Sequence, residues 1–289
     1  MERSIDHLVL ATRELDALAG RYEALGFTVT PRAAHNDEMG TSNRLVQLRD
    51  GAFIELLEVD RPNRLLAHDM VALPPYFSFG AHNLEVLSQR EGLSMLAFKS
   101  LDAWGELEDL ARAGLQTSAP FSFARRARQP DGSELEVAFR LGFVTHPDMP
   151  QVSFFLCENR YPKNFWKPDF QQHTNGAQAL SAIYLCAREP HLYDSFLAAL
   201  TNSPAHPVDG GLLYRVDIGH GLFVFTPDYL RSIAPDATVE TDRGPVLSGF
   251  RLNRFDQTQD GPLAIPAAEA GGAFIFWGDV TAGLPLKDG

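Results

Sequence analysis

Cysteine is scarce in this sequence, and basic residues are outnumbered by acidic ones. The two cysteines, Cys157 and Cys186, are too few for a disulfide framework and lie in no CxxC motif, so we expect reduced thiols. Lys and Arg together number 25 against 37 Asp and Glu, which gives a formal net charge of −12. This balance argues against binding to nucleic acids or anionic membranes, because both require basic patches.

Several familiar signals are also missing. The N-terminal segment has acidic residues within its first six positions and no long apolar core, so we expect no signal peptide. No apolar run approaches the ~18 residues of a membrane span. The chain contains no P-loop, no GxGxxG that opens a helix after a strand, no GxSxG elbow and no HExxH. We therefore expect a cytoplasmic protein with neither a nucleic acid nor a membrane as partner.

What the chain does contain is a repeated order of elements. Residues 5–12 form a compact apolar run typical of a buried strand, and apolar residues in 15–25 recur at helical spacing. Gly26 follows in the position of a helix C-cap. A similar strand and helix begin again near residues 93 and 181, and strands follow each helix.

A fourth unit after residue 246 is fainter, because the segment between its strands is short and contains proline. The pattern predicts an α+β fold of repeated βαβββ modules, with cupped, mostly antiparallel sheets and helices outside. We expect paired modules in residues 1–160, a connector in 161–177, and a third module with a degenerate fourth in 178–289. Residues 60–83 are expected to connect the first two units.

This order resembles the vicinal oxygen chelate superfamily, whose βαβββ modules pair around a pocket. Three segments look like a glyoxalase-like domain of that superfamily, within the group that includes glyoxalase, bleomycin resistance and extradiol dioxygenase proteins. They are IDHLVLAT (5–12), HNDEMGTSNRLVQLRDGAFIELLEV (35–59) and HTNGAQALSAIYL (173–185). The resemblance implies a small-molecule pocket and a type of chemistry, and it identifies no substrate.

The same resemblance implies that metal ligands come from the first and last strands of a module. His7 lies in the first strand and Glu55 in the last strand of the first unit, where neighbouring strands bring side chains together. An imidazole and a carboxylate suit a divalent metal such as Zn, Fe, Mn or Ni. Glu55 is also the candidate catalytic base. Alternation predicts that Glu58 faces the opposite side. Two alternatives remain for this pair. It binds an organic ligand without a metal, or His7 is an ordinary histidine of the hydrophobic core.

The second unit lacks an equivalent pair. Depending on the alignment, Leu93 or Met95 replaces His7, and Ala182 does so in the third unit. The residues near the Glu55 position in the second unit are Phe154, Phe155 and Cys157. Other residues must then complete a metal site, or the site takes no metal.

Further candidates lie near the first unit. We expect His35, Asn43 and Arg44 to bind substrate, with Arg44 pairing with a substrate carboxylate or, equally, with a surface acid. His82 and His173 are weaker candidates on loops. Arg125, Arg126 and Arg128 either bind an anion or, as we favour, flank a solvated hairpin.

The sequence thus predicts a glyoxalase-like or dioxygenase-like enzyme acting on a small vicinally oxygenated substrate, with a divalent metal as cofactor. The alternative is a non-catalytic protein of the same fold that sequesters a small molecule, which the missing second pair of ligands favours. A small molecule is the expected partner. Modules of this type pair within a chain or between chains; four units favour pairing within the chain, and a homodimer stays open.

Overall fold

The computed structural model describes residues 2–128, 134–216, 220–254 and 264–278. The first unit comprises β1 (Ile5–Ala11), α1 (Leu15–Ala24), β2 (Ala33–Ala34), β3 (Ser42–Gln47) and β4 (Phe53–Glu58). After α2 (Phe79–Leu87), the second unit comprises β5 (Gly92–Lys99), α3 (Ala103–Arg112), β6 (Gln116–Thr117), β7 (Phe121–Arg128), β8 (Glu134–Thr145) and β9 (Ser153–Asn159).

The connector contains α4 (Pro162–Phe165) and a 3₁₀ turn (Pro168–Gln171). The third unit comprises β10 (Ala177–Cys186), a 3₁₀ turn (Pro190–Tyr193), α5 (Asp194–Thr201), β11 (Ala205–Val208), β12 (Gly211–Arg215) and β13 (Gly221–Phe225). After α6 (Pro227–Ile233) come β14 (Val246–Arg254), β15 (Ala264–Ile265) and β16 (Phe274–Trp277). The short proline-containing segment between the strands of the fourth unit holds β15 and turns.

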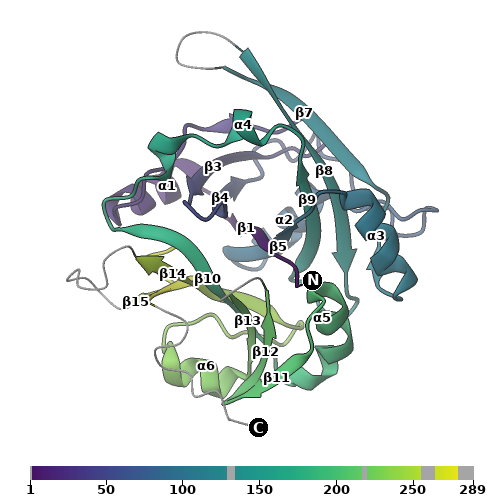
Figure 1. Cartoon of the computed structure of the whole chain (residues 1–289), viewed down its shortest axis with the longest axis vertical. Helices are drawn as coiled ribbons and strands as arrows, with labels where there is room; N and C mark the ends of the chain where they lie inside the picture. Colours follow the sequence, from purple (N-terminus) through teal and green to yellow (C-terminus); the bar gives the residue numbers. More distant parts are fainter. Residues whose placement is uncertain (1, 129–133, 217–219, 255–263, 279–289) are drawn as a thin grey trace.

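Two sheets carry these units (Figure 1). The first two units share a nine-stranded sheet in the order β2-β3-β4-β1-β5-β9-β8-β6, with β7 paired to β8. The last two share a seven-stranded sheet in the order β11-β12-β13-β10-β14-β16-β15. In each unit the first strand pairs in parallel with the last, as β1 does with β4 and β5 with β9. The α+β fold class is confirmed, and the sheets are mixed.

The ends of elements follow the local sequence. Gly26 has a φ of +86°, a conformation that few residues except glycine adopt readily, and its amide donates to the carbonyl of Glu23. The first helix therefore ends where the sequence predicts. Helix α2, in contrast, begins inside the predicted connector 60–83. Its N-cap is Ser78, whose hydroxyl accepts from the amide of Ala81.

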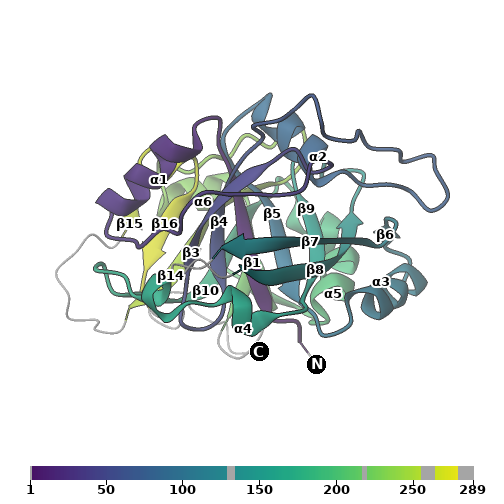
Figure 2. The same ribbon diagram turned by 90° about the horizontal axis from the view of Figure 1, so that it is seen from above.

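In the part of the chain that the structure describes, apolar side chains form three buried clusters. The largest contains residues from both sheets and from helices α1, α3 and α5, so the two sheets share one core. A second cluster, which includes Met95, Phe139 and Phe155, covers the other face of the nine-stranded sheet. In Figure 2, β7 and β8 run crosswise to β1 and β4. None of the helices in the described residues is long and apolar enough to cross a membrane.

Candidate functional site

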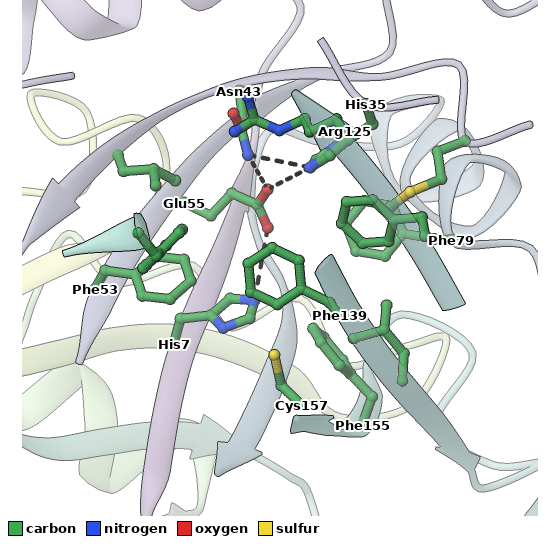
Figure 3. A pocket seen from close by; sticks show the side chains of 15 residues that line it. His7, His35, Asn43, Phe53, Glu55, Phe79, Arg125, Phe139, Phe155 and Cys157 are labelled. Carbon is green, nitrogen blue, oxygen red and sulfur yellow. Dashed lines mark hydrogen bonds and ion pairs between the residues drawn. The ribbon is translucent and has the colours of Figure 1, made fainter. Parts of the chain in front are cut away.

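His7 and Glu55 meet over the face of the first sheet that carries the second cluster. His7 Nε2 lies 3.6 Å from Glu55 Oε2, and both residues are buried, with 5% and 4% exposure. The parallel pairing of β1 with β4 explains this meeting, because it sets His7 opposite Phe53, two positions before Glu55 on the same face. Figure 3 shows both side chains pointing into one pocket. Glu58 lies on the other side and pairs with Arg32 at 2.9 Å.

Asp6 is a member of the site that the sequence did not reveal. Its Oδ1 lies 2.6 Å from His7 Nδ1, and the carboxylate is buried. Strict alternation would place consecutive residues on opposite faces. However, the pairing of β1 with β5 shifts register between Ile5 and His7, and this irregularity lets both side chains meet. Because a carboxylate accepts a hydrogen bond, Nδ1 is the nitrogen that donates to Asp6, and Nε2 is the nitrogen that faces Glu55.

The other end of the Glu55 carboxylate is held by the first unit. Asn43 Nδ2 donates to Glu55 Oε1 at 2.6 Å, and His35 Nε2 lies 3.5 Å from the same oxygen. His35 Nδ1 is 2.8 Å from Thr41 Oγ1, which holds the ring in place. The structure thus brings together four of the five residues that the sequence proposed for the site: His7, His35, Asn43 and Glu55.

Burial shifts the pKa values of these groups towards their neutral forms. Burial raises the pKa of Glu55 above its usual value, and the nearby His7 opposes this shift. Burial, with the charge of Arg125, lowers the pKa of His35 to about 3. At neutral pH His35 is therefore uncharged. Glu55 is a carboxyl group that accepts a proton more readily than an exposed one.

The pocket around these groups has walls that are mostly aromatic. It encloses about 450 Å³, including its open mouth. The His7 ring stacks on Phe53 with centroids 4.2 Å apart. The other phenylalanines in the lining are Phe79, Phe123, Phe139, Phe155 and Phe165. Pockets of this kind bind small molecules through apolar walls and a few convergent polar groups.

The donors in the pocket fit a divalent metal. His7 and Glu55 offer an imidazole nitrogen and a carboxylate oxygen 3.6 Å apart, which are donor types that zinc takes, and both would hold such an ion. Donor atoms of Asp6, His7 and Cys157 also lie within 4.8 Å of one another and are a second set that can hold a metal. Burial, together with Asp6, raises the pKa of the Cys157 thiol well above its usual value. Metal binding requires the ionised form of Cys157 and of Glu55 alike, and burial disfavours both ionised forms.

The second unit offers no equivalent pair. In the nine-stranded sheet His7 lies opposite Ala97 of β5, and Ala97 lies opposite Phe155 of β9. The two residues that the sequence alignments place at the position of His7, Leu93 and Met95, are both apolar and buried. Alkyl, thioether and phenyl side chains do not replace an imidazole and a carboxylate as ligands of a hard divalent ion.

Some predicted residues lie elsewhere. Arg44 points away from the pocket and forms an ion pair with Asp16 at 2.8 Å. The nitrogens of His173 bond to the Thr28 amide and the Gln47 carbonyl, which attaches the connector to the first unit. His82 is buried in α2, with Nε2 3.2 Å from the carbonyl oxygen of Ser94. None of these three residues lines the pocket.

Arg125, in contrast, does line the pocket, although the sequence favoured a solvated hairpin. It lies on β7, the strand that runs crosswise to β1 and β4. In the sequence, the basic residues of the hairpin could not predict this position. The position of Arg125 depends on how β7 folds back over the first unit.

Comparison with known proteins supports the fold. A family model described as a glyoxalase-like domain matches residues 5–201. A crystal structure of a hypothetical protein from Staphylococcus aureus matches with a TM-score of 0.70 and 12% identity, covering 96% of this chain and 99% of that one.

Two methylmalonyl-CoA epimerases match part of the chain. That of Streptomyces coelicolor has 22% identity and a TM-score of 0.38, covering 55% of this chain and 99% of its own. That of Mycobacterium tuberculosis has 20% identity and a TM-score of 0.37, covering 54% and 87%. No curated protein matches the sequence.

Proposed function

This chain belongs to the glyoxalase-like domain family, and we propose that it is an enzyme of the glyoxalase or dioxygenase type. Its substrate is a small molecule with oxygen on neighbouring carbons. The observation that carries the proposal is the setting of Glu55, a buried carboxylate between His7 and Asn43 in an aromatic pocket.

The geometry gives the two oxygens of Glu55 different roles. Oε1 accepts the hydrogen bond from Asn43, and this orients the carboxylate. Oε2 faces His7 and is the oxygen available to take a proton from a substrate carbon. Burial raises the pKa of Glu55, which makes it a stronger base once it is ionised.

His7 assists at the neighbouring substrate oxygen. Because Asp6 accepts from Nδ1, Nε2 is the nitrogen that faces the pocket, and in a neutral imidazole it can accept a hydroxyl proton or hold a metal. A divalent ion, held by His7 and Glu55, would supply Lewis-acid polarisation of the substrate oxygens when bound. The phenylalanine walls make the surroundings of the two groups apolar, which strengthens each of these interactions.

The second candidate is a protein that binds a small molecule without converting it. The lack of a second ligand pair favours this reading, because β5 and β9 set Ala97 and Phe155 beside His7 rather than a second imidazole and carboxylate. Such a protein would bind a planar compound equally well with and without EDTA.

Proton exchange tests the enzyme. Wild-type protein is incubated in D₂O with 2-hydroxyacetophenone and related 2-hydroxyketones, with and without Zn²⁺ or Mn²⁺, and loss of the proton next to the carbonyl is followed by NMR. Oxygen uptake with catechols is measured in parallel, since it reports the dioxygenase type. We expect exchange or oxygen uptake that Glu55→Gln lowers by about 100-fold or more.

Glu58→Gln is the matched control, because Glu58 lies on the same strand but faces away from the pocket. It should leave the rate unchanged. If Glu55→Gln were as active as wild type, Glu55 would not be the base. Binding without exchange or oxygen uptake would support the sequestering protein instead.

A further inference from the structure

Arg125 stands at the boundary between two hollows. It lines the aromatic pocket around Glu55 and also an outer groove next to it. The residue is half-buried on β7, where it lies opposite Val137 of β8. A molecule that enters the pocket from the groove would therefore pass the Arg125 side chain.

Among the residues that the structure describes, the guanidinium of Arg125 makes no hydrogen bond or ion pair, whereas its neighbour Arg126 pairs with Glu134 at 3.2 Å. Burial lowers the pKa of Arg125, and the nearest opposing influence is the charge of Glu55. Holding a cation half-buried without a counterion costs free energy, and an anionic ligand would recover it.

The outer groove is cationic although the chain as a whole is acidic. Its lining includes four basic residues and one acidic residue, Asp169. One of the basic residues, Arg32, is already neutralised by Glu58 and Asp60, at 2.9 and 3.0 Å. Arg125 is thus a cation that no described residue pairs with, at the inner end of a groove whose field favours anions.

The pocket walls on the inner side of Arg125 suit the apolar part of a ligand. Phe123 stacks on Phe139 with centroids 5.3 Å apart, and Phe139 meets Phe165 edge to face at 5.6 Å. A planar ring fits among such rings, and a charged group does not. The ligand that matches both regions has an aromatic body and one anionic group at its outer end.

We propose that Arg125 binds the carboxylate of the substrate, and that the substrate is an aromatic or similarly apolar carboxylic acid. This inference rests on the proposed function and names its substrate class. A planar guanidinium matches a carboxylate by two parallel hydrogen bonds. One unpaired cation near the Glu55 carboxylate suits a single negative charge better than the two charges of a phosphate monoester.

Matched acids and amides provide the test. Binding of 3-phenylpropanoate, 4-phenylbutanoate and their neutral amides is measured by NMR titration with wild type, Arg125→Gln and Arg126→Gln. We expect each acid to bind wild type about tenfold or more tightly than its amide. Arg125→Gln should remove this preference while leaving the amides bound as before.

Arg126→Gln makes the same change of charge on the same strand. We expect it to weaken acid binding by less than about twofold, since its side chain is 80% exposed and screened by solvent. Equal binding of acids and amides to wild type, no binding of any acid, or a preference that survives Arg125→Gln would overturn the proposal.

The same assay separates this inference from the proposed function. Glu55→Gln removes the base but leaves Arg125, so it should still prefer acids. A protein that keeps the acid preference but shows no Glu55-dependent exchange would support Arg125 and contradict the enzyme. A protein with Glu55-dependent exchange but no preference for acids over amides would support the enzyme and contradict the role of Arg125.

Discussion

Asp6 Oδ1 and His7 Nδ1 lie 2.6 Å apart, and this contact fixes which nitrogen of His7 faces Glu55. Carboxylates that hold a functional imidazole in this way set both its tautomer and its orientation. Asp6 is therefore a positioning residue, which acts on the pocket through His7.

Replacing Asp6 by Asn tests this role. Asp6→Asn loses the charged acceptor, so the proton of His7 should no longer be confined to Nδ1, and ¹⁵N shifts of the ring should report the change. We expect the affinity for Zn²⁺ to fall about 10- to 100-fold. Asp109→Asn on α3, where the side chain is 62% exposed, is the control and should change neither value. Unchanged ¹⁵N shifts in Asp6→Asn would show that Asp6 does not set the tautomer.

A second prediction concerns the approach of α2 to the pocket wall. A Cβ at Gly80 would overlap the carbonyl oxygen of Met39, whose side chain lines the pocket. We expect Gly80→Ala to lower the free energy of unfolding by about 1–3 kcal/mol in urea titrations. In helix α1, a Cβ at Gly20 would meet nothing within 4 Å. Gly20→Ala should raise stability by about 0.5–1 kcal/mol. If Gly80→Ala and Gly20→Ala changed the free energy of unfolding equally, the close packing of Gly80 against Met39 would be contradicted.

The third prediction concerns pH and stability. Burial lowers the pKa of His82 to about 4, against 6.5 for the unperturbed group. Between these values the unfolded chain binds a proton that the folded chain does not, so the free energy of unfolding falls as the pH falls from about 6.5 to 4. The contribution of His82 is roughly 3 kcal/mol. His35, whose pKa is lowered to about 3, acts in the same direction.

His82→Gln isolates this effect. Urea titrations between pH 6 and pH 4.5 should show that the free energy of unfolding falls more slowly with decreasing pH in the variant than in wild type. The difference between the two slopes should correspond to about one bound proton. An identical slope in both proteins would mean that His82 is not responsible.

Arg44 provides a fourth prediction. Its ion pair with Asp16 lies at the surface, where the Asp16 side chain is 62% exposed. We expect Arg44→Gln to leave binding of 3-phenylpropanoate unchanged and to affect stability little, because exposed ion pairs contribute little. Weaker binding in Arg44→Gln, equal to the loss in Arg125→Gln, would restore Arg44 as the carboxylate-binding residue.

The sequence predicted the parts of the site that depend on the order of the strands and on the alternation of residues along them. The resemblance to the superfamily implied that His7 and Glu55 lie on neighbouring strands, where the structure places them, and Gly26 marked the end of the first helix. Alternation along β3 could also have separated Asn43 from Arg44, since consecutive residues face opposite sides of a sheet. Asn43 reaches Glu55, and Arg44 faces α1.

The remaining parts depend on tertiary structure. Asp6 reaches His7 only because β1 is irregular where it pairs with β5, and no residue pattern announces that shift. Arg125 reaches the pocket because β7 crosses the first unit, which depends on the packing of two modules. Helix α2 was missed because its connector is rich in proline, although Ser78 is a recognisable N-cap.

The most direct test of the shared centre of His7 and Glu55 is the metal content of purified protein. Wild type, His7→Ala and His82→Ala are stripped with EDTA, reloaded with Zn²⁺, desalted and measured by mass spectrometry of the elements. We expect about one ion per chain in wild type and in His82→Ala, whose imidazole lies outside the pocket, and almost none in His7→Ala. Equal, substoichiometric zinc in all three proteins would contradict a metal centre at His7 and Glu55.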